Sequence, residues 1–386
     1  MPLLSHPLWL VGFRPFFILA GLAAIVLPPL WALIFSGQLG PPEIPFSAVQ
    51  WHAHEMFFGF GWAVLGGFLL TATKNWVSIR GYHGPALLFL AGAWIVERIT
   101  MSFGGHWPPA LFWLGNTLFL GSIIVMLLWT LIRHRQSDSY RDNAFFLIAL
   151  PLFLAAKYLM LAGGDFVAGY TMAIALFRMA FLIMLERTLT QFMRSAFAVD
   201  ILRQPKLDLA IKLLGLALVF EFLLPAPLAS ALALALAALL GLRFCFWKPH
   251  LAFSRIDIGI MYIGYLMIVL QLLADASGHL GKVVGIGSLS VHLFTVGVMG
   301  CVIPAMMTRI ANGHTGRKVI FQPIDRALLY LMLATLLFRT LLPQLFPAAY
   351  LGWIHLSACS WALAYGILTW RIAPLLLRPR TDGREH

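Results

Sequence analysis

The second hydrophobic segment of the chain opens with Trp51-His52-Ala53-His54-Glu55-Met56 and runs on through residues 57–71. Two imidazoles and a carboxylate therefore lie close together in a segment that is otherwise apolar enough for lipid. Ionisable side chains are unfavourable inside a bilayer, so such a group indicates a functional site. Ser47, three residues before Gln50, forms a capping-box pattern. The pattern predicts that the helix starts near residue 47 and contains both histidines.

The spacing of the two histidines limits what they can bind together. At about 100° per residue, His52 and His54 point roughly 200° apart around a helix. We therefore expect that they do not bind one metal ion together. The spacing favours one histidine as a cofactor ligand and the other as part of a different site.

Composition places the chain among polytopic membrane proteins. Of its 386 residues, 61% are hydrophobic and 11% are charged, and long apolar runs recur along the whole length. No connection is long enough for a soluble domain. The sequence predicts an all-α bundle of about twelve transmembrane helices, in a single integral membrane domain over residues 1–386, with spans near 14–35, 47–73, 84–102, 108–132, 142–162, 167–193, 207–224, 227–246, 254–275, 284–308, 324–343 and 348–373.

The residues behind the net charge of +12 are distributed as in a membrane protein, and their distribution does not indicate a nucleic-acid site. Lys and Arg residues gather at the termini and in the connections after even-numbered spans, without a basic patch interleaved with aromatic residues. This positive-inside pattern predicts that both termini are cytoplasmic and that the partner is the lipid bilayer. Of the 27 Lys and Arg residues, 21 lie at the termini, in these connections or in the parts of the spans that adjoin them, and the other six are Arg98, Lys157, Arg178, Lys212, Lys282 and Arg339.

With both termini in the cytoplasm, a set of ionisable residues inside the spans lies at a similar depth in the membrane. They lie near the middle or in the outer third of their spans, on the periplasmic side. Residues from separate spans are not expected to share a depth by chance, so we predict that they surround one site. The residues are His52, His54, Glu55, Lys157, Arg178, Glu221, His292 and His355.

Three residues in the last part of the chain are candidate cofactor ligands. His292 and Met299 are seven residues apart on one helix face, and imidazole and thioether are ligands that suit haem iron or copper. His355 is followed by Ser357 and Ser360, so it is either a ligand or a partner in hydrogen bonds between helices.

The charged members of the set allow two interpretations. Lys157 and Arg178 could form structural ion pairs with Glu55 or Glu221, or they could neutralise haem propionates or hold another anion. Glu55, beside His54, could relay protons or tune the imidazole. We therefore name Glu55, Lys157 and Arg178 as candidate catalytic residues.

A second dense motif covers residues 306–318, at the cytoplasmic end of a predicted span. Gly313 and Gly316 are expected to end the helix and turn the chain. His314 has no ligand partner near it in the sequence, so the basic residues here are expected to contact lipid phosphates rather than to form a metal site.

Several separated motifs, which together cover nearly the whole length, carry a family resemblance. They are GFRPFF at 12–17, HAHEM at 52–56 with its continuation to Asn75-Trp76, Arg178 with Glu186-Arg187, the stretch 292–317, and PRTDG at 379–383. In these motifs the chain resembles the NnrS family, haem- and copper-containing membrane proteins of bacterial nitric oxide metabolism.

The resemblance implies haem b and copper as cofactors and the bacterial inner membrane as the location. It implies metal ligation by His52, His54 and His292, while His355 is included for its depth alone. We expect a protein that binds nitric oxide in the periplasmic half of the bilayer and gives nitric oxide tolerance. It could also reduce nitric oxide, as an oxidoreductase with a separate electron donor.

A carrier is the alternative function. Twelve helices with charges between the midplane and the outer surface also describe a transporter, for instance of a metal or a nitrosylated iron complex. Carriers usually have broken helices at a central site, and the interruptions at Pro28-Pro29, Pro151 and Pro304 are not placed symmetrically. A haem–copper oxidase subunit is excluded by the lack of any His-His pair.

Overall fold

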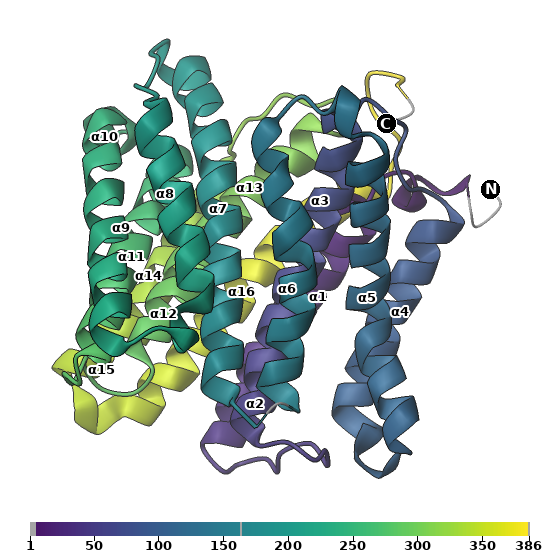
Figure 1. Ribbon diagram of the computed structural model, residues 1–386. Helices are drawn as coiled ribbons and strands as arrows, with labels where there is room; N and C mark the ends of the chain where they lie inside the picture. Colours follow the sequence, from purple (N-terminus) through teal and green to yellow (C-terminus); the bar gives the residue numbers. More distant parts are fainter. Residues whose placement is uncertain (1–4, 163, 385–386) are drawn as a thin grey trace. The chain divides into compact units, whose positions relative to one another are not determined.

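The computed structural model describes residues 5–162 and 164–384, and over these residues it consists of helices without any strand (Figure 1). Among the described residues, eleven helices are long and apolar enough to cross a membrane. These findings confirm the predicted all-α, polytopic membrane fold. The cytoplasmic position of the two termini stays a prediction.

The predicted span at 207–224 is the one that lacks a long continuous helix. It corresponds to α8 (Pro205–Ala217) followed by the 3₁₀ segment η7 (Leu218–Leu223), with a non-helical backbone at Phe220. The α-helical part rises about 20 Å and the 3₁₀ part about 12 Å, which together match the roughly 30 Å of a hydrocarbon core. An interrupted helix of this length can still cross the membrane. Together with the eleven long helices it would give the twelve crossings that the sequence predicts.

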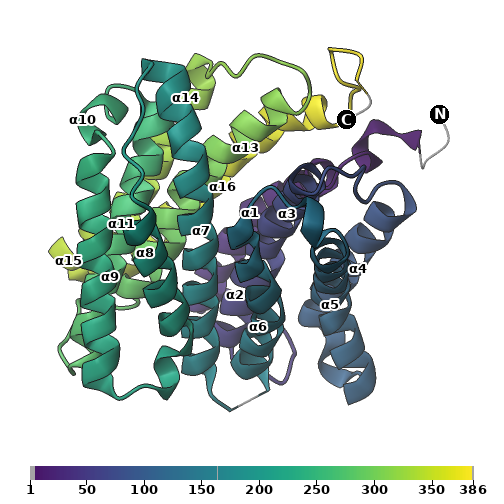
Figure 2. The ribbon, with the colours of Figure 1, turned by 45° about the horizontal axis from the view of Figure 1, so that its top comes forward.

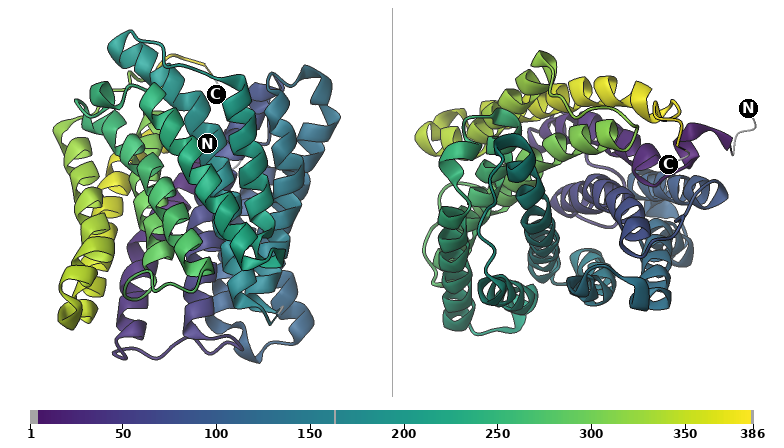
Figure 3. Two further views of the ribbon diagram at one scale, coloured as in Figure 1. Left: turned by 60° about the vertical axis from the view of Figure 1, so that its left-hand side comes forward. Right: turned by 90° about the horizontal axis from the view of Figure 1, so that it is seen from above.

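The helices gather into two compact units, and the prediction of a single integral membrane domain stays a prediction. Unit 1 comprises Met1–Gly169, Met307–Ile320 and Tyr365–His386. Unit 2 comprises Tyr170–Met306 and Phe321–Ala364. Within each unit, most helices run side by side along one direction (Figure 3).

In unit 1, α4 packs on α5, and α1 packs on α3. The start of α1 and the end of α16 lie at the same end of this unit (Figure 2), where Arg14 donates to the carbonyl of Leu376 over 2.8 Å. The principal helices of unit 1 are α1 (Phe13–Phe35), α2 (Ala48–His54), α3 (Trp62–Trp76), α4 (Pro85–Phe103), α5 (Pro109–Arg133) and α6 (Ala144–Leu161).

In unit 2, α11 packs against α9 and against α12. Three helices, α7 (Phe166–Phe197), α13 (Cys301–Gly313) and α16 (Tyr350–Leu376), contribute residues to both units. The other helices of unit 2 are α8, α9 (Ala226–Phe246), α10 (Pro249–Ala252), α11 (Ile256–His279), α12 (Leu289–Phe294), α14 (Pro323–Leu336) and α15 (Leu342–Leu345).

The helix predicted over 47–73 forms, and its middle is π-helical. Ser47 caps α2 as predicted, since its Oγ accepts from the amide of Gln50 over 3.2 Å and its amide donates to Oε1 of Gln50 over 2.9 Å. The π segment η3 (Glu55–Gly61) joins α2 to α3. Two further π segments, η8 (Thr295–Gly300) and η9 (Leu337–Leu341), interrupt helices of unit 2. Such interruptions occur frequently at functional sites.

Candidate functional site

Ionisable and polar side chains from α2, η3, α4, α5 and α6 meet in unit 1. At the centre of this group, Nζ of Lys157 lies 2.5 Å from Oε1 of Glu97. It also donates to the backbone carbonyl of Asn116. Lys157 and Glu97 are 3% and 0% exposed, so each charge depends on the other for compensation. We call the group the buried polar cluster and define it as His54, Glu55, Glu97, Arg98, Asn116 and Lys157.

Arg98 joins the two carboxylates of the buried polar cluster. Its Nη1 lies 2.8 Å from Oε2 of Glu55, and its Nη2 lies 2.9 Å from Oε1 of Glu97. The guanidinium also lies over the ring of Trp94, 5.4 Å from its centroid. Two cations thus balance two carboxylates, and the cluster carries no net charge while His54 is neutral.

The π segment η3 provides the space that Arg98 occupies. A Cβ at Gly59 would lie 2.0 Å from Nη1 of Arg98, so only glycine permits the observed position. The carbonyl of Gly59 accepts a hydrogen bond of 2.9 Å from the indole of Trp94, which ties η3 to α4. The glycine in this π segment therefore positions the guanidinium between the two carboxylates.

His54 is enclosed by the cluster and is 0% exposed. Its Nδ1 lies 3.2 Å from Oε1 of Glu55, and its Nε2 lies 3.2 Å from Nδ2 of Asn116 and 3.4 Å from Oε1 of Glu97. These distances fit the tautomer in which Nδ1 donates to Glu55 and Nε2 accepts from Asn116. Nε2 of His54 therefore faces both the amide of Asn116 and the carboxylate of Glu97.

Two buried acceptors of the cluster have no hydrogen-bond donor among the described residues: Oε2 of Glu97 and Oδ1 of Asn116. Buried acceptors in proteins are normally satisfied by a donor, often a water molecule. We therefore expect a water molecule or a proton-donating ligand to bind at these two atoms.

His52 faces a different neighbour, as the helical spacing predicts. Its ring stacks on that of Trp31 in α1, with centroids 4.3 Å apart and planes 8° from parallel. It is half-buried, whereas His54 is fully buried. The imidazole of His52 thus lies outside the buried polar cluster, beside an aromatic surface.

In unit 2, His292 lies on α12. Its Nδ1 is 2.8 Å from the carbonyl oxygen of Ser288 and 2.9 Å from the Oγ of the same residue. A histidine whose Nδ1 donates to a carbonyl presents Nε2 for metal coordination. Met299 is buried in η8, and His355 is half-buried on α16. Each unit thus contains a histidine three residues before a π segment, His52 before η3 and His292 before η8.

Of the two interpretations left open for Lys157 and Arg178, the structure shows ion pairs for both, with partners other than Glu55 and Glu221. Lys157 pairs with Glu97 rather than with Glu55 or Glu221. Arg178, which is 1% exposed, donates to Oε1 of Gln271 over 2.8 Å and lies 3.8 Å from Oδ2 of Asp275. Nε and Nη2 of Arg178 have no hydrogen-bond partner among the described residues.

A second buried ion cluster joins α7, α8 and α9 in unit 2. Glu186 is contacted by Arg203, by Lys212 over 3.2 Å and by Arg243 over 3.3 Å. Arg203 and Arg243 also reach Asp208, over 3.2 Å and 3.3 Å. Because these ion pairs join three helices, we assign the group a structural role.

Two members of the buried polar cluster, Glu97 and Asn116, are not among the site residues predicted from the sequence. Glu97 stands beside Arg98 near the expected end of a span, and such a pair is typical of a solvated helix end. The rule that singles out Glu55, an ionisable side chain within an apolar segment, applies equally to Glu97. Asn116 is uncharged and carries no comparable signal.

The described side chains suit some metal centres better than others. Among the described residues, no group of three or more His, Cys, Asp or Glu is arranged to hold a metal ion. A haem iron needs only one or two axial side chains. Single imidazoles such as His52 and His292 therefore suit a haem iron more directly than a copper site with many protein ligands.

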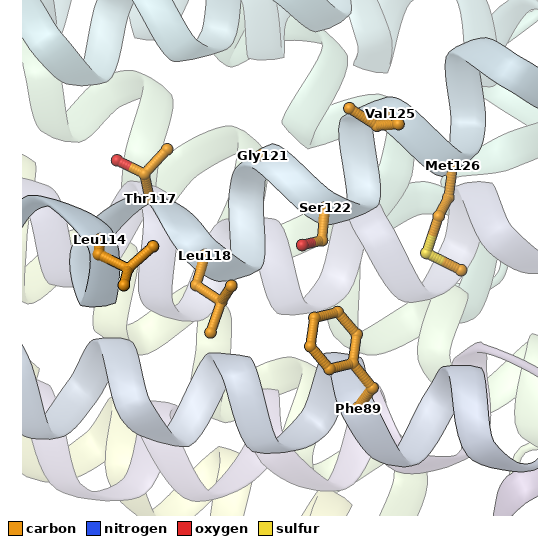
Figure 4. Close-up of a pocket in the computed structure, with 8 residues that line it drawn as sticks. All are labelled: Phe89, Leu114, Thr117, Leu118, Gly121, Ser122, Val125 and Met126. Atoms are coloured by element: carbon orange, nitrogen blue, oxygen red, sulfur yellow. The ribbon is translucent and has the colours of Figure 1, made fainter.

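A shallow cavity of about 480 Å³ lies between α4 and α5 (Figure 4). It contains no ionisable side chain, and its surface is almost wholly apolar, so it adds no acid, base or charged group to the site. Its lining residues are Phe89, Leu114, Thr117, Leu118, Gly121, Ser122, Val125 and Met126.

Comparison with known proteins tests the resemblance seen in the motifs. The chain has no match among curated proteins. Residues 7–380 match the family described as NnrS protein, which is nearly the whole chain and includes every motif named above except the last residues of PRTDG. The chain therefore belongs to the NnrS family.

Proposed function

We propose that this membrane protein binds nitric oxide at a haem b centre, accompanied by copper, in the periplasmic half of the bacterial inner membrane. It thereby gives tolerance of nitric oxide. The observation that carries the proposal is the arrangement on α2, where a half-buried histidine beside an aromatic ring is followed, two residues later, by a histidine inside the buried polar cluster. Family membership supports the same function.

His52 and His292 are the proposed metal ligands. The ring of His52 lies against Trp31, and an aromatic neighbour of this kind suits the edge of a flat macrocycle. The Nδ1 of His292 is held by Ser288, which directs Nε2 toward coordination. His54 does not fit this role as well, because both of its ring nitrogens face partners in the buried polar cluster. A haem or copper centre, when bound, supplies the metal to which nitric oxide coordinates.

The buried polar cluster is proposed to hold a proton close to the centre. Glu55 and Glu97 flank His54, and the cations Lys157 and Arg98 lie against both carboxylates. Arg178 is proposed to hold an anionic group such as a haem propionate, since two of its guanidinium nitrogens have no hydrogen-bond partner among the described residues. Met299 and His355 remain candidate cofactor contacts in unit 2.

Nitric oxide itself is small, neutral and soluble in lipid. It can therefore reach an intramembrane site without a polar channel. Its reduction to nitrous oxide and water consumes two electrons and two protons for each pair of molecules, so a reductase would need an electron donor in addition to the cluster. Consumption of nitric oxide with nitrous oxide as the product, in the presence of a reduced donor, is the assay for that activity.

Transport is the second candidate, and one observation favours it. Helices of both units are interrupted by π segments, and each of two such segments follows a histidine. Interrupted helices at a binding site are a feature of carriers. A protein that folds without colour and moves a metal or a nitrosylated iron complex across proteoliposomes would establish this function in place of the redox one.

The ligand assignment is tested by cofactor content. Haem and copper are measured in the purified full chain and in the variants His52→Ala, His292→Ala and His54→Gln, with His250→Ala, an exposed histidine on α10, as the matched control. We expect loss of haem or copper in the first two variants and wild-type content in the control. If His52→Ala and His292→Ala both keep full content, the assignment is wrong.

A further inference from the structure

Four of the sequence motifs meet at one end of unit 1, although they lie far apart in the chain. The amide of Phe13 donates to Oγ1 of Thr71 over 2.9 Å, and the ring of Phe13 lies 5.6 Å from that of His314. The amide of Thr381 donates to the carbonyl of Thr315 over 3.0 Å. The stretches 12–17, 71–75, 313–317 and 379–383 therefore build one structure that the proposed function does not use.

Arg14 is the buried cation of this structure. It is 1% exposed, and its Nη1 donates to the carbonyls of Leu376 and Arg378, both over 2.8 Å. Its Nε and Nη2 have no hydrogen-bond partner among the described residues. A guanidinium has five N–H donors and no acceptor. An anionic or carbonyl oxygen is therefore expected to accept hydrogen bonds from these buried nitrogens.

The surrounding charges are mostly positive. Arg317 and Arg380 both lie close enough to Arg14 to repel its charge. Among the described residues, Asp382 provides the carboxylate at this end of unit 1. Arg380 donates to it through Nε over 2.8 Å and through Nη2 over 2.5 Å. Burial, followed by the charges of Lys74 and Arg380, lowers the pKa of His314 to about 4, so its imidazole is neutral at pH 7.

The C-terminal segment places two of these cations. Oγ1 of Thr381 donates to the carbonyl of Gly316 over 2.9 Å, and Nη1 of Arg380 donates to the carbonyl of His314 over 3.0 Å. Gly316 has a φ of +80°, and a Cβ there would lie 2.9 Å from Cγ of Asp382. The turn after α13 thus requires glycine so that the segment can lie over it and bring Arg380 to the carbonyl of His314.

We propose that Arg14, Arg317 and Arg380 bind an anion that carries a phosphate group. A guanidinium presents paired N–H donors that match two oxygens of a phosphate, and three such groups beside a single carboxylate leave positive charge uncompensated. Two sources share this chemistry. One is the headgroup of an anionic lipid, because Arg14 lies in the first turn of a helix apolar enough to span the membrane. The other is a free phosphate compound.

Binding to the purified full chain tests the proposal. Native mass spectrometry measures retention of phosphatidylglycerol against zwitterionic phosphatidylcholine, and a separate titration uses inorganic phosphate. The variants are Arg14→Gln and Arg317→Gln. The second leaves the bonds from Arg14 to the carbonyls of Leu376 and Arg378 in place, so it serves if Arg14→Gln fails to fold. Arg194→Gln is the matched control, because Arg194 pairs with Asp200 on the exposed surface of unit 2.

We expect the affinity for one of the two anionic probes to fall at least tenfold in Arg14→Gln and Arg317→Gln and to be unchanged in Arg194→Gln. Loss confined to phosphatidylglycerol identifies a lipid headgroup, and loss confined to inorganic phosphate identifies a free anion. If both probes bind the two variants as tightly as they bind Arg194→Gln, or if neither probe binds the wild type, the proposal is overturned.

Discussion

A Cβ at Gly59 would lie 2.0 Å from Nη1 of Arg98, so the guanidinium reaches Glu55 only because position 59 has no side chain. This relationship joins the π segment η3 to the charge balance of the buried polar cluster. It also allows the cluster to be altered without changing any of its members.

Gly59→Ala is therefore expected to displace Arg98 and to weaken its contact with Glu55. The guanidinium is the end of a flexible side chain and can move aside, so the cost should be smaller than the roughly 3 kcal/mol of removing one partner of a buried pair, and the melting temperature in detergent should fall by a few degrees. Gly92→Ala on α4 is the control, since a Cβ there meets nothing within 4 Å. In an exposed helix interior that change should stabilise the protein slightly. A Gly59→Ala protein as stable as Gly92→Ala would contradict the description of the cluster.

The pair Lys157–Glu97 supports a double-mutant cycle. Lys157→Met should destabilise the fold by about 3–5 kcal/mol, because it leaves the carboxylate of Glu97 buried without its nearest cation. Adding Glu97→Gln removes that charge and should restore a large part of the loss, giving an interaction energy of about 1–3 kcal/mol. Melting curves of the wild type, both single variants and the double variant measure it. Additive effects of the two substitutions would show that the pair is not coupled.

Part of this arrangement could be predicted from the sequence, and part could not. The apolar runs indicate the helices, and the period of the helix separates His52 from His54, because both depend on local spacing alone. The pairing of Lys157 with Glu97 depends on how α4 and α6 pack, which no local pattern records. The π segment η3 has the composition of an ordinary apolar helix, so its extra residue per turn and the special role of Gly59 are visible only in the fold.

His314 predicts a pH dependence of stability. Its pKa is lowered from 6.5 to about 4 by burial and then by Lys74 and Arg380. Between these values the unfolded chain binds a proton that the folded chain does not, so stability falls as the pH drops from 6.5 toward 4, by up to about 3 kcal/mol. The slope of melting temperature against pH should be smaller in His314→Gln than in the wild type. His250→Gln should keep the wild-type slope, and equal slopes in all three proteins would disprove the assignment.

The interrupted helix α8–η7 predicts the membrane topology. If it crosses the membrane, reporters fused after Arg203 and after Leu224 should lie on opposite sides, with the first in the cytoplasm together with both termini. Alkaline phosphatase, which is active outside the cytoplasm, and green fluorescent protein, which is fluorescent within it, distinguish the two sides. Reporters on the same side would mean that α8–η7 does not cross, and the two termini would then lie on opposite sides.

The most direct test of the central claim is an optical titration of the purified full chain with nitric oxide. The account predicts a haem Soret band that shifts on addition of nitric oxide in the wild type and in His250→Ala, and a weaker or absent band in His52→Ala. A folded, colourless wild-type protein, or a spectrum and nitric oxide response that His52→Ala leaves unchanged, would contradict it.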